Sequence, residues 1–222
     1  MRVLYHLPLS PFCRKLRLAL REKSLDFELR VERVWDRRPE FLTLNPAGQV
    51  PVLVEEDGRP FADSSAISEY LEETYPDRRL LGRNAIERAE TRRLVAWFDQ
   101  KFHAEVTLNL LFEKVNKRFY ALGNPDSAAI RMGKHFIHGH LDYIADLSER
   151  RRWLAGDDFS LADMAAAAHL SCIDYLGDVP WDEHPRAKDW YVRVKSRPSF
   201  RPLLGDHVAG MPPPAHYADL DF

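Results

Sequence analysis

Hydrophobic and polar positions follow two different patterns along the first 80 residues. Four short segments, apolar or alternating, predict strands: residues 2–6, 26–31, 51–54 and 59–61. Three segments repeat apolar positions at helical spacing: residues 11–23, 39–44 and 64–75. An Asp-Gly pair predicts a tight turn between the last two strands. The order β-α-β-α-β-β-α is typical of a thioredoxin-like domain.

The second half of the chain has a helical pattern almost throughout, from about residue 85 to 205. Apolar side chains four residues apart predict a long first helix that runs towards Tyr120, and its length predicts a kink or break. Residues 160–176 are apolar on nearly all sides, which predicts a helix buried within the domain. Ser160 and Asp163 are spaced as a capping box at its start, so we interpret both as structural.

These patterns predict two domains and a tail. An α/β thioredoxin-like domain covers residues 1–77, a linker covers 78–84, and an all-α helical domain covers 85–205. Residues 206–222 form an extended C-terminal tail, because a run of three prolines cannot continue a helix.

Composition excludes several classes of protein. With 32 Lys and Arg against 34 Asp and Glu, the net charge of −2 does not favour binding to nucleic acid or to an anionic membrane. No apolar run approaches the roughly 20 residues of a membrane-spanning helix. The first residues, interrupted early by Pro8, do not form a signal peptide. Two distant cysteines, Cys13 and Cys172, favour neither disulfides nor a metal site, so we expect a cytoplasmic protein without a metal.

The segment Leu-Ser-Pro-Phe-Cys, residues 9–13, looks like a redox motif that lacks its first sulfur. A dithiol cycle needs a cysteine where this chain has Ser10, so that chemistry is excluded. Serine before proline is also an ordinary helix start, with Ser10 as the N-cap and Pro11 as the first helical residue. Cys13 is expected to be an inert buried side chain.

Four segments, in this order and spacing, resemble the cytosolic glutathione transferase superfamily. They are SPFCRKLRLAL (10–20), FLTLNPAGQVPVL (41–53), DSSAISEYLEE (63–73) and FSLADMAAA (159–167). The resemblance implies the two-domain fold predicted above and usually a homodimer. It also implies that glutathione is a possible substrate and that no cofactor is required.

The resemblance implies a glutathione site made of five residues. Val50 and Pro51 would be joined by a cis peptide bond, and the backbone of Val50 would pair with the cysteinyl part of glutathione. Ser64 would hold the γ-glutamyl carboxylate at a helix N-terminus, and Asp63 would hold the ammonium group. Ser10 would donate a hydrogen bond to the sulfur and stabilise the thiolate.

Two departures from the family pattern lie in this half of the chain. Asp63 stands where the family usually has glutamate. The lysine that often holds the glycine end of glutathione is absent, and an arginine such as Arg37 could substitute for it. Trp35, next to several charged residues, is alternatively an exposed aromatic side chain suited to a protein interface.

The tail allows three interpretations: a disordered end, a wall of the electrophile pocket, or a short motif that orders on binding a partner. In the third, the contacts would come from Tyr217, Asp219, Asp221 and Phe222. This ending, with the Trp35 loop, resembles a branch of glutathione-transferase-like division proteins that bind filaments of FtsZ. The resemblance implies a non-catalytic adaptor. The alternative is a transferase that conjugates glutathione to a small electrophile; a reductase or isomerase has less support.

Overall fold

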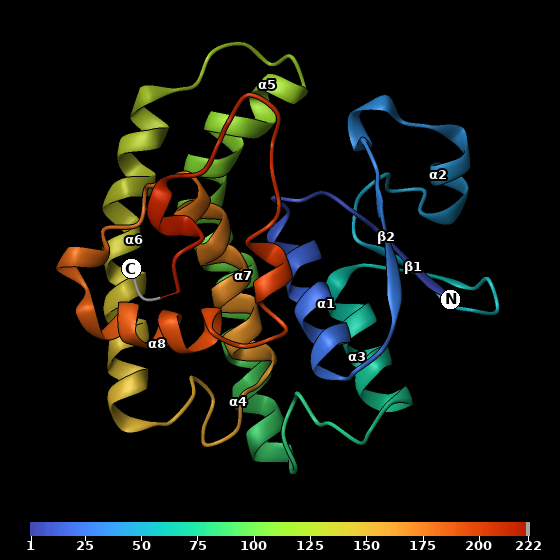
Figure 1. The fold of residues 1–222 in the computed structure, drawn as a ribbon, viewed down its shortest axis with the longest axis horizontal. Coiled ribbons are helices and arrows are strands. Elements are labelled where there is room, and N and C mark those ends of the chain that lie inside the picture. The colour runs from blue at the N-terminus through green and yellow to red at the C-terminus, as the bar shows by residue number, and fades with distance from the viewer. Residues whose placement is uncertain (221–222) are drawn as a thin grey trace.

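The structure of the protein is a computed structural model that describes residues 1–220. Figure 1 shows a smaller α/β domain beside a larger helical domain. The α/β domain contains β1 (Arg2–His6), α1 (Pro11–Glu22), β2 (Phe27–Val31), η1 (Val34–Asp36), α2 (Pro39–Leu44), β3 (Val52–Val54), β4 (Pro60–Ala62) and α3 (Ser64–Thr74). The predicted order of strands and helices is confirmed, and the short turn η1 is added to it.

The four strands form one mixed sheet in the order β2-β1-β3-β4. β1 runs parallel to β2 and antiparallel to β3, which places Leu4 of β1 opposite Leu53 of β3. Both leucines are buried, as their alternating positions predict. β2 lies at an edge and is largely exposed.

The helical domain follows a short linker. It contains α4 (Ala85–Ala96), η2 (Trp97–Asn116), α5 (Lys117–Phe119), α6 (Ser127–Arg150), α7 (Leu161–Tyr175), η3 (Trp181–Glu183), α8 (Pro185–Lys195), η4 (Arg201–Leu203) and η5 (Ala215–Tyr217). The first three form one helical run, so the expected break is a change to wider, π-type hydrogen bonding at Trp97. No helix among residues 1–220 is long and apolar enough to span a bilayer.

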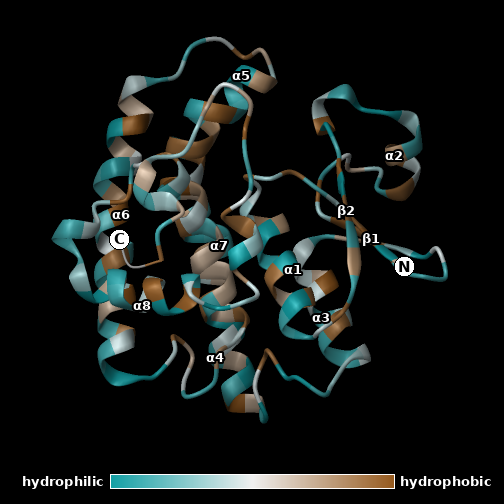
Figure 2. Ribbon diagram, in the orientation of Figure 1, coloured by the Kyte–Doolittle hydropathy of each residue, from teal (hydrophilic) through white to brown (hydrophobic). Residues whose placement is uncertain are grey.

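Helix α7 is the centre of the molecule, and all of its residues are buried. Figure 2 shows mostly pale and brown positions on α7, with hydrophilic positions concentrated on the outer helices. The predicted capping box is confirmed, because the backbone N–H and hydroxyl of Ser160 both lie 3.1 Å from Oδ2 of Asp163. Oδ1 of Asp163 also accepts a hydrogen bond from Nε1 of Trp190 at 3.0 Å. These contacts make both residues structural.

Candidate functional site, a cleft between the domains

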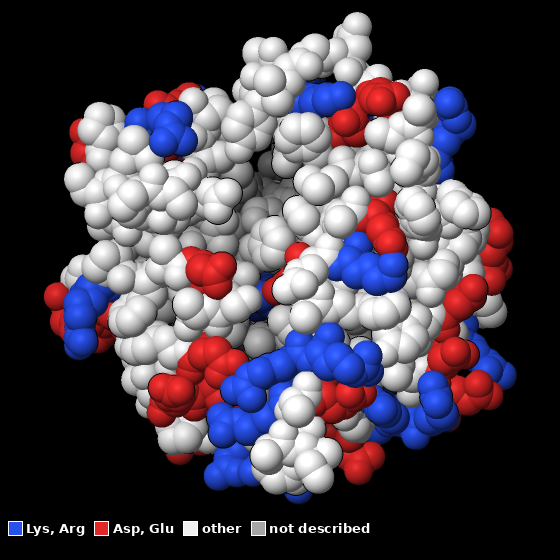
Figure 3. Space-filling model, turned by 180° about the vertical axis from the view of Figure 1, so that it is seen from behind, with Lys and Arg blue, Asp and Glu red and all other residues white. Residues whose placement is uncertain are grey.

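A cleft of about 570 Å³ opens between the two domains. Its walls are residues 7–12, the segment around η1, one face of η2 and α5, and residues 207–209 of the tail. Figure 3 shows the hollow between the domains bordered mainly by uncharged residues. Most of the described lining is apolar, and none of it is Asp or Glu. The cleft therefore suits an apolar or anionic ligand better than a cation.

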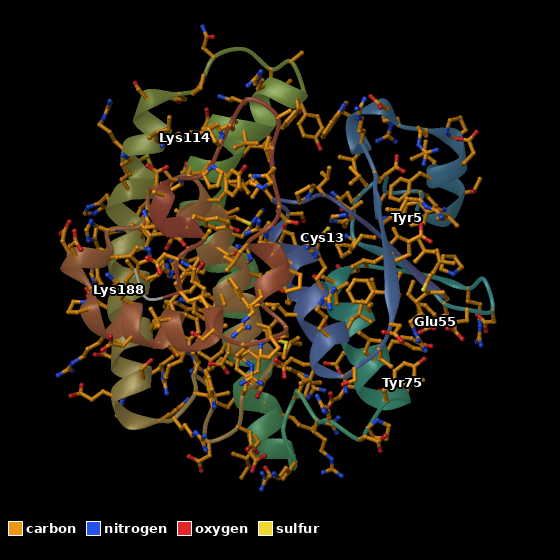
Figure 4. The ribbon with its side chains drawn as sticks, viewed as in Figure 1. Tyr5, Cys13, Glu55, Tyr75, Lys114 and Lys188 are labelled. Atoms are coloured by element: carbon orange, nitrogen blue, oxygen red, sulfur yellow. The ribbon has the colours of Figure 1, made fainter. Side chains whose placement is uncertain are left out.

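Ser10 lies in this cleft, at the start of α1. Its Oγ accepts a hydrogen bond from the backbone N–H of Cys13 at 3.3 Å, so the predicted N-cap is confirmed. The cap uses a lone pair, which leaves the hydroxyl proton of Ser10 able to point at a ligand. Cys13 is fully buried where the domains meet, and burial raises the pKa of its thiol to about 11 (Figure 4). Cys13 is therefore not expected to supply a reactive thiolate at neutral pH.

Two of the residues implied for the glutathione site, Ser10 and Val50, line this cleft. The Val50–Pro51 peptide bond is cis, and Val50 lines the cleft together with Ser10. Asp63 and Ser64 stand at the start of α3, outside the residues that line the cleft. Oδ1 of Asp63 accepts hydrogen bonds from the N–H groups of Ser65 and Ala66, at 2.8 and 3.0 Å. One oxygen of this carboxylate is therefore already used to cap the helix.

The arginine that reaches the cleft is Arg33, which sequence reasoning did not select. Arg37 is exposed, has a left-handed backbone with φ of 43°, and lies outside the cleft lining. The run of arginines in this loop signals a cation near the cleft, but the residue order alone does not show which one faces inward.

Trp35 lines the cleft from the side of the α/β domain. Its ring stacks on Phe119 of α5, with centroids 5.0 Å apart and planes 7° apart, and meets the edge of Tyr120 at 5.9 Å. Trp35 is thus half-buried, while Phe119 and Tyr120 remain 37% and 39% exposed. The three rings form an aromatic cluster shared by both domains. Sequence reasoning missed Phe119 and Tyr120, whose only signal was an aromatic pair at a helix end.

Of the three interpretations of the tail, folding back against the pocket is the one the structure shows for residues 206–220. In Figure 1 the red segment rises between the domains towards α5 and then returns. His207, Val208 and Ala209 form part of the cleft wall. The tail is held at its start by Asp206, whose Oδ2 accepts hydrogen bonds from Arg14 at 3.2 Å and Arg17 at 2.7 Å.

The prediction that Tyr217 contacts a partner is wrong, because its side chain has no exposed surface. Its hydroxyl donates to the carbonyl oxygen of Leu203 at 3.2 Å, its ring packs on Tyr175, and burial raises its pKa to about 12. Asp219 is exposed and stays a candidate. Asp221 and Phe222 lie outside the described residues.

A buried polar chain runs from the cleft into the domain interface. Oγ1 of Thr107, on the cleft wall, is 2.8 Å from Nδ1 of His169, and Nε2 of His169 is 3.4 Å from Oδ1 of Asp99. Asp99 is also paired with the buried ammonium group of Lys15. Burial lowers the pKa of His169, so the ring is neutral near pH 7. These polar side chains connect the two domains, and the sequence analysis did not identify them.

Of the three neighbouring histidines 135, 138 and 140, His135 is exposed and the other two have side-chain partners. His138 contacts His184 through ring nitrogens 2.9 Å apart, and His140 is 2.9 Å from Oε2 of Glu105. In the described part of the chain, no group of three or more His, Cys, Asp or Glu side chains is placed to hold a metal ion.

Family models match both halves of this architecture. The glutathione S-transferase N-terminal domain matches residues 4–79, and the glutathione S-transferase C-terminal domain matches residues 137–198. The chain belongs to the glutathione S-transferase family. The predicted family and its two-domain fold are thereby confirmed.

Individual proteins are also similar over the whole chain. FtsZ-localized protein A of Caulobacter vibrioides is 52% identical, with 100% of this chain and 98% of that protein covered. The solved structure of FzlA from C. crescentus has a TM-score of 0.96 at 52% identity, covering 100% of this chain and 99% of the other. A glutathione S-transferase from Rhodospirillum rubrum F11 has a TM-score of 0.98 at 59% identity, with both chains fully covered. The predicted resemblance to the FtsZ-associated branch is confirmed.

Proposed function

We propose that this protein is a glutathione-transferase-fold adaptor that binds FtsZ filaments in bacterial cell division, without transferase activity. The observation that carries the proposal is the similarity over the full chain to a protein named for its localisation with FtsZ. The site is consistent with it, since Asp63, Ser64 and Arg37 are not among the residues that line the cleft. An adaptor of this kind acts in the cytoplasm, where FtsZ polymerises.

The contact surface that we assign to FtsZ has two parts. The first is the aromatic cluster of Trp35, Phe119 and Tyr120, in which Phe119 and Tyr120 are partly exposed and which lines the same cleft as Arg33. The second is the chain end, residues 218–222, in which Asp219 is exposed. We infer a homodimer, because two copies of each contact would add avidity on a filament. Light scattering should then give twice the mass of the chain.

Trp35→Ala is expected to weaken co-sedimentation with FtsZ polymers by roughly 30-fold or more, since a central aromatic anchor contributes about 2 kcal/mol or more to an interface. Met132→Ala is the matched control, because Met132 is 52% exposed on α6, away from the cluster. Equal binding by the two variants would remove the aromatic cluster from the interface.

Removal of residues 218–222 is expected to reduce FtsZ co-sedimentation strongly and to leave the melting temperature unchanged. The cut falls after Tyr217 because that side chain is buried, and a longer deletion would also destabilise the fold. If the shortened protein pellets with FtsZ as the full chain does, the end of the tail is not a contact.

Catalysis is the second candidate function, favoured by the placement of Ser10 and Val50 together in the cleft. A transferase that binds glutathione would be stabilised by about 2.7 kcal/mol at roughly 100 times the dissociation constant. Under the adaptor proposal, millimolar glutathione leaves the melting temperature unchanged. Ser10→Ala then costs only the helix cap, about 1 kcal/mol, with no effect on FtsZ binding. A glutathione-dependent rise in melting temperature, lost in Ser10→Ala, would favour the transferase.

A further inference from the structure

The tail segment 206–217, which we name the strap, is anchored at its first residue by buried charge. Arg14 is fully buried, and its guanidinium donates to Asp206, to the hydroxyl of Ser171 at 2.8 Å, and to the carbonyl oxygen of Pro8 at 2.7 Å. Pro8 belongs to the cleft wall. One side chain therefore connects the cleft wall, α7 and the start of the strap.

The middle of the strap is held by the hydroxyl group of Tyr175 and by the packing of Val208 and Met211 against the hydrophobic core. Tyr175 donates to the carbonyl oxygen of Met211 at 2.7 Å and accepts from the N–H of Val208 at 2.9 Å. Val208 and Met211 also form an isolated antiparallel bridge. Val208 and its two neighbours in sequence line the cleft. The same few atoms thus set the shape of the cleft wall and the path of the strap.

The end of the strap is locked on the far side of α7. Nε2 of His216 is 3.0 Å from Oδ1 of Asp174, and Nζ of Lys195 donates to the carbonyl oxygen of His216 at 3.1 Å. Tyr217 follows, fully buried, and the backbone N–H of Asp219 bonds to the carbonyl oxygen of His216 at 3.1 Å. The position of Asp219 therefore depends on the strap being closed.

We propose that the cleft is an effector site, and that a small apolar anion bound there strengthens FtsZ binding by holding the strap closed. This inference rests on the proposed function. The ligand class follows from the lining, which is largely apolar, includes Arg33 and contains no carboxylate among the described residues.

The direction of the effect follows from how the strap is held. Apart from η5 and the isolated bridge, the strap has no regular secondary structure, so its closed state depends on side-chain hydrogen bonds and on the packing of Val208, Met211 and Tyr217 against the core. Residues 207–214, between the anchors at Asp206 and Tyr217, therefore open at a lower free-energy cost than the helices beneath them. A ligand that touches residues 207–209 contacts the strap only in its closed state, so it shifts the population towards that state. Linkage requires FtsZ to increase ligand affinity by the same factor.

The test uses Tyr175→Phe, which keeps the buried ring and removes both of its bonds to the strap. This variant is expected to bind FtsZ about five-fold or more weakly than the wild type, within the usual range of coupling between sites. Saturating anilinonaphthalene sulfonate, a fluorescent apolar anion, is expected to restore wild-type affinity. Tyr70→Phe on α3, away from the strap, is the matched control. It should bind FtsZ as the wild type does, both with and without the probe.

Amide hydrogen exchange of Val208 and Met211, measured without FtsZ, reports how often the strap opens. The probe should slow this exchange, most clearly in Tyr175→Phe. Because the chain has five tryptophans, a loss of tryptophan-to-probe energy transfer in Trp35→Phe should place the probe in the cleft. The proposed coupling between cleft and strap is wrong if Val208 and Met211 exchange at the same rate with and without bound probe. It is also wrong if Tyr175→Phe binds FtsZ with wild-type affinity. If the wild type does not pellet with FtsZ at all, the proposed function fails, and slower exchange with the probe would still establish the link between cleft and strap.

Discussion

Asp206→Ala is expected to lower the free energy of unfolding by about 3–5 kcal/mol, because it leaves two buried guanidinium groups without their carboxylate. The side chains of Arg14 and Arg17 are 0% and 4% exposed, and both donate to Oδ2 of Asp206. Burial of a guanidinium group costs free energy, and this cost is offset only while the carboxylate of Asp206 is present. Urea unfolding followed by tryptophan fluorescence measures the loss.

An exposed ion pair provides the matched control for this prediction. Arg30 pairs with Glu28 on β2 at 3.3 Å, with both side chains about half exposed, so Glu28→Ala should change stability by less than about 1 kcal/mol. Equal effects of Asp206→Ala and Glu28→Ala would mean that the carbonyl oxygens of Pro8 and Pro202 satisfy the two arginines without Asp206.

Stability is expected to fall steeply as the pH drops from 6.5 to 4. Burial lowers the pKa of His6 to about 4, with the charge of Arg17 as a second cause, and burial lowers the pKa of His103 to about 4. The unfolded chain takes up these protons near pH 6.5 and the folded protein does not, so acid favours unfolding across this interval. For His6, which is 4% exposed, the shift corresponds to about 3 kcal/mol at pH 4. His140 and His169, whose pKa values burial also lowers, add to the same trend.

Urea unfolding at several pH values between 7 and 4 measures how the free energy of unfolding depends on pH, and His6→Gln should weaken that dependence by removing one titrating group.

Carboxylates contribute to stability in a lower pH interval. A hydrogen bond from Arg93 lowers the pKa of Glu90 to about 2, so its contribution is present above about pH 4.5 and is lost towards pH 2. A flat profile between pH 7 and 4.5 would show that these histidines are accessible to protons in the folded protein.

Much of the fold was predictable because it follows from local patterns of hydrophobic and capping residues. Strands and helices of the α/β domain follow from periodicity, and the burial of α7 follows from a segment with almost no polar face. The capping box of Ser160 and Asp163 is a local signal and is found as predicted. In the site, Ser10 and Val50 were placed through the family resemblance, since their residue types alone are compatible with ordinary structural roles.

Sequence alone therefore determined the order of elements, the family and the helix start at Ser10, because each depends on contacts between residues close in the chain or on a shared pattern. Tertiary structure decided which charges are buried, which arginine faces the cleft, and where the tail lies. Periodicity shows that α1 has a polar face but not what covers it, and the carboxylate that receives Arg17 is 189 positions away. The stacking of Trp35 on Phe119 likewise joins two domains. Only the packed chain brings such distant groups together, and in this protein they form both the cleft and the strap.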